Sequence, residues 1–179
     1  MKRKSEYFGN TVFPTLNSYA NTPPTLIKQE RDWTCSVACI RTILSAFNEY
    51  PSEDSFISKF ELIPGPHYTE EILAKKMFGE NKKIISCYDY PESDLSISLL
   101  NQLLNEKYFI MAECMYNYAH WVVLLGYFVV RDRSDPEESY ILFYDPYYDE
   151  PRLVRADEFQ TMWCDPDGHK SEFIAVKAI

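Results

Sequence analysis

The stretch QERDWTCSVACIRTILSAF, residues 29–47, passes from a polar loop into an apolar helix, and it does so at a cysteine. From Thr34 to about Phe47, apolar side chains occur on nearly every face of the expected helix. A helix that is apolar all round is buried at the centre of a domain. The stretch therefore predicts a central buried helix that begins at Cys35, with Thr34 as its N-cap.

Downstream of this helix the residue pattern is first helical and then extended. Apolar spacing and capping residues predict helices over residues 51–60, 69–79, 93–106 and 156–163. Runs of β-branched and aromatic residues predict strands over residues 84–88, 108–114, 120–130, 140–144 and 173–176. Helices that precede consecutive strands indicate an α+β domain with an antiparallel sheet.

The chain of 179 residues fits one domain with a core of its own. Residues 1–28 are polar and end in a segment that contains two consecutive prolines, Pro23 and Pro24. This segment predicts an extended lead-in, with a short strand at residues 26–28. We expect residues 29–179 to form a single catalytic domain without a linker or an internal repeat.

The composition limits the classes of partner. A net charge of −9 and a pI near 4.8 argue against nucleic acid and anionic membranes as partners. No apolar run long enough for a transmembrane helix and no secretory signal is present. Five cysteines without a CxxC pair are typical of a reducing compartment, which favours a cytoplasmic protein, although export without a classical signal stays open. Three histidines, none at ligand spacing from a cysteine pair, predict neither a metal nor a cofactor.

Three side chains far apart in the sequence form a candidate catalytic set. Cys35 stands where a helix begins, His120 at the head of a strand, and Asp145 at the end of another strand before Pro146. Backbone N–H groups and the helix dipole favour the thiolate at a helix start. If the two strands pair antiparallel, the Asp145 carboxylate reaches the His120 imidazole and orients it. The set therefore predicts a thiol nucleophile with an oriented base, which attacks an amide or a related acyl bond.

Gln29 lies six residues before Cys35, in the loop that passes the helix N-terminus. Its side-chain amide and the Cys35 N–H are candidates for an oxyanion hole. The neighbouring Cys39 is expected to be a small buried hydrophobe, and His67 and His169 are expected to lie in exposed loops.

The three motifs together resemble the papain-like cysteine peptidases that process bacteriocins by cutting leader peptides after double glycine, and their stand-alone relatives. The resemblance is carried by Gln29 and CSVACI from residue 35, by HWVVLLGY from residue 120, and by the Asp145-Pro146 pair followed by a helix. It implies a papain-like fold, in which N-terminal helices and a central buried helix carrying Cys35 precede an antiparallel sheet. It also implies Cys35 as nucleophile, His120 as base, Asp145 as orienter and Gln29 in the oxyanion hole.

Two positions depart from the pattern of that family, which usually has Asp before and Gly after its cysteine. Here these positions are Thr34 and Ser36, and a side chain at residue 36 reshapes the cleft. We expect a cysteine peptidase that acts on a peptide or protein, with Trp33, Ser36 and Trp121 as substrate contacts. Two alternatives stay open: a protein glutamine deamidase or acyl or amine transferase with the same triad, and an inactive domain that binds a peptide or protein. The oligomeric state also stays open.

Overall fold

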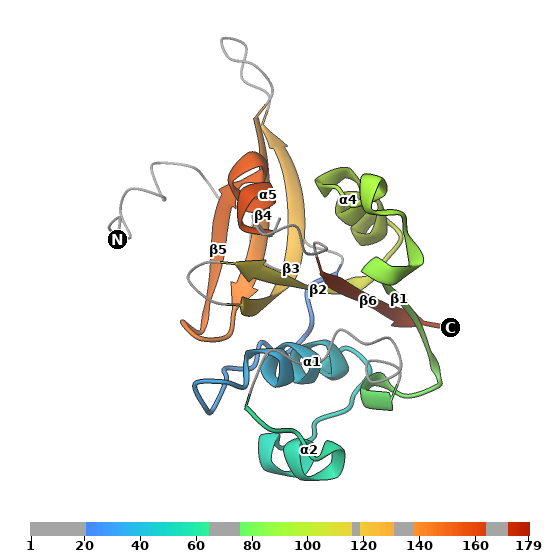
Figure 1. The fold of residues 1–179 in the computed structure, drawn as a ribbon, viewed down its shortest axis with the longest axis vertical. Helices are drawn as coiled ribbons and strands as arrows, with labels where there is room; N and C mark the ends of the chain where they lie inside the picture. The colour runs from blue at the N-terminus through green and yellow to red at the C-terminus, as the bar shows by residue number, and fades with distance from the viewer. Residues whose placement is uncertain (1–20, 65–75, 116–118, 131–137, 164–171) are drawn as a thin grey trace.

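An antiparallel sheet of six strands forms the centre of the computed structural model, which describes residues 21–64, 76–115, 119–130, 138–163 and 172–179 (Figure 1). The strand order across the sheet is β1-β6-β2-β3-β4-β5. The strands are β1 (Lys82–Ser86), β2 (Phe109–Met115), β3 (Ala119–Val130), β4 (Glu138–Asp145), β5 (Glu150–Arg155) and β6 (Phe173–Ala178). Strands β2 to β5 pair in chain order, whereas β6 returns to lie between β1 and β2. The predicted α+β class with an antiparallel sheet is confirmed.

Helices cover both faces of the sheet (Figure 1). Helices α1 (Cys35–Ser45) and α2 (Glu53–Phe60) pack on one face, and α4 (Ile97–Asn105) and α5 (Ala156–Trp163) on the other. Along β3, Val122 and Leu124 point toward α4 and α5, whereas Val123 and Leu125 point toward α1. Because side chains alternate along a strand, a sheet covered on both faces requires such continuous apolar runs.

Helix α1 is the predicted central helix. Val37, Ile40, Ile43 and Leu44 are at most 2% exposed, and the helix packs against β3 and β2. Thr34 stands at the N-cap position, but its side chain accepts no hydrogen bond from the helix. The predicted N-cap position is therefore confirmed, but the hydroxyl bonds to other partners and does not cap the helix.

Two predicted boundaries shift because of capping side chains. The strand predicted over residues 84–88 is β1, which ends at Ser86; Asp89 Oδ2 accepts from Ser86 N at 2.7 Å, and a 3₁₀ turn, η3 (Cys87–Asp89), follows. The helix predicted from residue 93 begins only at Ile97, because Ser96 is its N-cap and accepts from Leu99 N. A second 3₁₀ turn, η4 (Glu92–Asp94), precedes it.

The strand predicted at residues 26–28 does not form. Its backbone runs along α1 instead, where Ile27 N donates to Thr42 Oγ1 at 3.0 Å and Thr25 N donates to Ser45 Oγ at 3.2 Å. Strand β5, in contrast, was not predicted from the sequence, because Pro151 and alternating charges hide its pairing with β4.

Two further expectations, the helix over residues 69–79 and the extended lead-in, are only partly covered by the described residues. The helix predicted over residues 69–79 lies mostly outside the described residues; residues 76–78 are helical, and Gly79 follows with a φ of +84°. Within the lead-in, residues 21–28 are described, and the buried Asn21 side chain donates to the Leu104 and Tyr108 carbonyls. None of the helices in the described part of the chain is long and apolar enough to cross a membrane.

Candidate active site

The start of α1, the head of β3 and the end of β4 carry the three predicted catalytic side chains. Cys35 is the first residue of α1 and is partly exposed. His120 is the second residue of β3, and Asp145 is the last residue of β4. Because β3 and β4 are antiparallel, the head of β3 and the end of β4 lie at the same end of the sheet.

The register between β3 and β4 brings His120 and Asp145 together. Val123 pairs with Tyr144, so Asp145 follows at the level of Val122, two residues from His120. Residues two apart share a face of the sheet, which makes the two side chains diagonal neighbours. His120 Nε2 lies 2.8 Å from Asp145 Oδ1, and the two residues are 4% and 0% exposed.

The His120 imidazole also forms a hydrogen bond with the Cys35 side chain. Since Nε2 faces Asp145, Nδ1 is the ring nitrogen left for the thiol. Burial lowers the pKa of His120, but the hydrogen bonds to Asp145 and Cys35 outweigh burial and raise this pKa to about 9. His120 is therefore an imidazolium at neutral pH, held between a carboxylate and a sulfur atom.

Three groups hold Asp145 in its ionised form. Burial raises the pKa of Asp145, yet the hydrogen bond from His120, the Tyr147 N–H and the Arg152 guanidinium together hold this pKa below its ordinary value. Tyr147 N donates to Oδ1 at 3.1 Å, and Arg152 Nη1 lies 3.2 Å from Oδ2. The buried carboxylate is thus satisfied on both oxygens, as a buried charge requires.

Gln29 is held beside this end of the sheet. Its backbone N–H donates to the Pro146 carbonyl at 3.1 Å, next to Asp145. Its side-chain Nε2 donates to the Arg31 carbonyl at 2.8 Å, and its Oε1 is buried without a hydrogen-bond partner among the described residues. Only an NH₂ group can face a carbonyl oxygen, so this contact determines the orientation of the amide and leaves a second N–H on Nε2 for another acceptor.

Comparison with solved structures gives a likeness of fold. The peptidase domain of Streptococcus ComA, a bi-functional ABC transporter involved in a quorum sensing pathway, matches the chain with a TM-score of 0.55 and 15% sequence identity. The match covers 86% of this chain and 98% of that one. The chain has the papain-like fold. Neither a scan against protein-family models nor a search of curated proteins gave a match, so the likeness shows the fold alone.

The predicted substrate contacts lie in different surroundings. Trp33 is half-buried in the loop before α1. Ser36 is 4% exposed within α1, and Trp121 is 3% exposed among the apolar side chains that face α1. Contact between these side chains and a substrate stays a prediction. Two further residues that the sequence singled out, His67 and His169, lie outside the described residues.

Sequence reasoning missed Arg152 and Glu53, which contact the site residues or their loop. Arg152 pairs with Phe143 across β4 and β5, which makes it a diagonal neighbour of Asp145. The contact between Arg152 and Asp145 could have been predicted if β5 had been recognised in the sequence as the second strand of a hairpin with β4. Glu53 carries no such signal, because its partners lie in a loop about twenty residues earlier. Within the described ranges, no group of three or more His, Cys, Asp or Glu side chains could hold a metal ion.

Proposed function

We propose that the protein is a cysteine peptidase that uses Cys35, His120 and Asp145, with a peptide or protein as substrate. One observation carries this proposal: a single buried imidazole contacts both the Cys35 side chain and the Asp145 carboxylate, within the fold of a peptidase domain. Cys39, one turn further along α1, offers no comparable nucleophile. It is fully buried, and burial, with smaller effects of Cys35 and Asp145, raises the pKa of its thiol well above the ordinary value.

In the proposed reaction, the Cys35 thiolate attacks the carbonyl carbon of the scissile amide while the His120 imidazolium keeps its proton. The negative charge that develops on the carbonyl oxygen is held by the Cys35 N–H and by the second N–H of Gln29. A residue in the first turn of a helix has no intrahelical acceptor for its N–H, so the Cys35 N–H is suited to this role.

His120 then donates its proton to the leaving amine, and the C–N bond breaks to leave a thioester on Cys35. The imidazole, now neutral, takes a proton from water as the water attacks the thioester. Collapse of the second tetrahedral intermediate releases the carboxylic acid and restores the thiolate and imidazolium. Asp145 keeps the imidazole in one orientation through both steps and stabilises its charged form.

The proposal is tested with a peptide library made by digesting a whole proteome, which samples many sequences at once. Wild type is expected to cleave a subset of these peptides, and mass spectrometry of the new termini would define the sequence preference. Cys35→Ala is expected to lose all cleavage, because the alanine side chain has no sulfur with which to form the thioester. Cys39→Ala, which removes a buried thiol from the same helix, is the matched control and should retain cleavage.

A second measurement does not depend on the substrate. Iodoacetamide is expected to label Cys35 faster than a free cysteine at pH 6, because an imidazolium adjoins its sulfur, and His120→Ala should abolish the excess. Cleavage that persists in a folded Cys35→Ala protein would contradict the mechanism. Deamidated glutamines without new termini would keep the chemistry but change the reaction, and an unreactive Cys35 would favour a binding domain.

A further inference from the structure

The loop that carries Gln29 has no helix or strand between residues 29 and 34, so its shape depends on individual backbone and side-chain hydrogen bonds. Within it, the Arg31 carbonyl accepts from Gln29 Nε2 at 2.8 Å and from Thr34 N at 3.2 Å. The position of Arg31 therefore determines where the Gln29 amide points. Whatever holds the Arg31 backbone and Thr34 in place also holds the proposed oxyanion hole.

Thr34 is the link between this loop and the rest of the molecule. It is fully buried, and its hydroxyl accepts from Arg31 N at 3.1 Å. The same hydroxyl lies 2.9 Å from the Arg31 carbonyl and 3.1 Å from Glu53 Oε1, two acceptors for its single proton. A hydrogen bond to a carboxylate is the stronger of the two choices. The hydroxyl thus connects the loop to Glu53, in place of capping α1.

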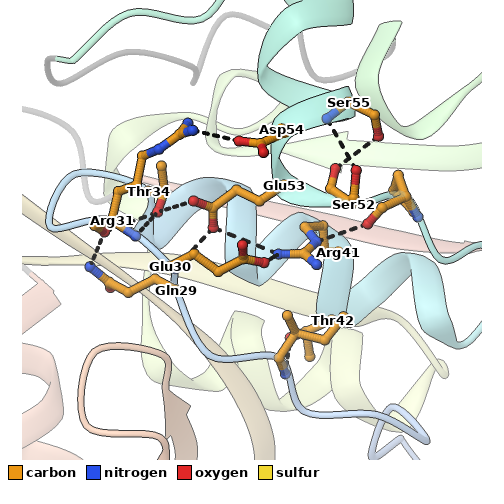
Figure 2. A network of polar contacts seen from close by, with 12 residues as sticks. Gln29, Glu30, Arg31, Thr34, Arg41, Thr42, Ser52, Glu53, Asp54 and Ser55 are labelled. Carbon is orange, nitrogen blue, oxygen red and sulfur yellow. Dashed lines mark hydrogen bonds and ion pairs between the residues drawn. The ribbon is translucent and has the colours of Figure 1, made fainter.

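Glu53 is the first residue of α2, and it is 1% exposed. Figure 2 shows its carboxylate between the loop and Arg41 of α1. Oε2 accepts from the backbone N–H of Glu30 at 3.0 Å and lies 3.6 Å from Arg41 Nη1. The two oxygens therefore bind two points of the same loop, Glu30 and Thr34, from a neighbouring helix.

Arg41 completes the network. Its guanidinium donates from Nη1 to Glu30 Oε1 at 2.8 Å and from Nε to the Pro51 carbonyl at 2.9 Å. A buried carboxylate and guanidinium cost desolvation energy, and apolar side chains of the same volume often give equal stability. Stability alone therefore does not account for a buried charge at residue 53, whereas the need to hold one loop conformation does.

We propose that Glu53 is a positioning residue of the oxyanion hole, which acts through Thr34 and Arg31 on the side-chain amide of Gln29. This inference rests on the proposed function. It predicts that loss of the Glu53 carboxylate misplaces the Gln29 donor while Cys35, His120 and Asp145 stay in contact. Reactions at Cys35 that develop an oxyanion are then impaired, and reactions that do not develop one are spared.

Two reagents separate these cases at pH 7. With 4-nitrophenyl acetate, the Cys35 thiolate attacks the ester carbonyl, passes through an oxyanion, and leaves acetyl-Cys35 as 4-nitrophenolate departs. With iodoacetamide, the same thiolate displaces iodide from a saturated carbon, and no oxyanion forms. The rate of acetylation divided by the rate of alkylation, both measured at Cys35 by mass spectrometry, reports the oxyanion hole.

Glu53→Gln is expected to lower this ratio by about tenfold or more, but by no more than the roughly hundredfold to thousandfold loss seen when an oxyanion donor itself is removed. Thr34→Val removes the hydroxyl at constant shape and should lower the ratio equally. Thr34→Ser keeps the hydroxyl and should leave the ratio of the two rates unchanged. The double variant of Glu53→Gln and Thr34→Val should lose no more than either single variant, because both act through one contact.

Asp54→Asn is the matched surface control. Its carboxylate is 80% exposed and binds the Arg31 guanidinium, not the Arg31 backbone, so the ratio should not change. An unchanged ratio in folded Glu53→Gln and Thr34→Val proteins would overturn the inference alone. Equal losses of both rates would also overturn it. A wild-type Cys35 that reacts no faster than glutathione with either reagent would refute the proposed function, and the inference with it.

Discussion

At the scale of single residues, the decisive feature is the charge held on His120. Its imidazole lies between the Asp145 carboxylate and the Cys35 side chain, and these contacts raise its pKa to about 9 despite burial. Arg152 binds the second oxygen of Asp145 at 3.2 Å and so favours the carboxylate, but as a cation it does not favour a second cation nearby. The Asp145 carboxylate therefore favours the charged form of His120, whereas the positive charge of Arg152 opposes it.

A prediction at this scale concerns the titration of His120. In Asp145→Asn, the midpoint of the His120 titration should fall by about 1–3 pH units from the wild-type value, because the adjacent negative charge is gone. The sign follows from the cause: the carboxylate stabilises the imidazolium, and its removal lets the proton leave at lower pH. Imidazole ¹⁵N chemical shifts measured against pH would report the midpoint, which we expect at about 9 in the wild type.

Arg152→Met is the control for this titration. It removes a cation from the far side of Asp145, and the His120 midpoint should stay or rise. The alkaline limb of peptide cleavage should move with the midpoint in each variant, since protonation of the leaving amine needs the imidazolium. A midpoint that does not differ between wild type and Asp145→Asn would contradict the assignment of Asp145 as orienter.

At the scale of elements, the two helices that pack on the same face of the sheet, α1 and α2, have different N-termini. Helix α2 has an ordinary N-cap, in which Ser52 Oγ accepts from Ser55 N at 3.2 Å. Helix α1 has Thr34 at the corresponding position, but that hydroxyl bonds to Glu53 and Arg31. A capping side chain accepts a hydrogen bond from one of the first N–H groups of a helix. In α1 the Thr34 side chain accepts no such bond. The Thr34 hydroxyl at the start of α1 therefore holds the loop before the helix and does not cap the helix.

The end of α2 supports a prediction about stability. Glu61 has φ 52° and ψ 41°, in the left-handed region, and Leu62 N donates to the Ile57 carbonyl at 3.0 Å. This is the helix ending in which glycine is favoured, because a Cβ is strained there. Glu61→Gly should therefore raise the free energy of unfolding by about 1 kcal/mol, measured by urea denaturation. Glu61→Ala keeps the Cβ and should give no such gain; a loss of stability in the glycine variant would contradict the assignment.

At the scale of the whole molecule, the sheet separates two apolar layers. One lies under α4 and α5 and includes Phe143, Phe159 and Trp163, each at most 1% exposed. The other lies under α1 and α2. The candidate site is at the end of the sheet where α1 begins, so its buried charges depend on the packing of the entire domain. The free energy of unfolding should therefore depend on their titration.

The pH dependence of stability has a definite sign. His120 has a folded-state pKa of about 9, above the ordinary histidine value of about 6.5. A raised folded-state pKa stabilises the fold fully below about pH 6.5, and this contribution is lost as pH rises through about 9. The loss is of the order of 3 kcal/mol, at 1.36 kcal/mol per pKa unit. Urea denaturation across this range should show the decrease in wild type, and His120→Gln, which cannot titrate, should lack it. Parallel curves for the two proteins would refute the shifted pKa.

The elements whose residue pattern is periodic or continuous could be predicted from the sequence. The largely apolar stretch from Val37 to Leu44 predicts a buried helix, and the β-branched and aromatic runs of β2, β3 and β4 predict strands. The order of Cys35, His120 and Asp145, each beside the start or end of an element, was sufficient to nominate them. Such patterns indicate burial and local backbone geometry, and both depend on residues that are close together in the sequence.

Contacts between elements were decided only by the tertiary structure. The hydroxyl of Thr34 is a helix cap by sequence, but Glu53 from α2 competes for it in the fold. Residues 26–28 resemble a strand, but side chains of α1 take their backbone N–H groups. Arg152 reaches Asp145 only because β5 pairs with β4. The physical reason is the same in each case: a polar group bonds to the nearest suitable partner in space, and the chain positions of such partners follow from packing, which no local pattern encodes.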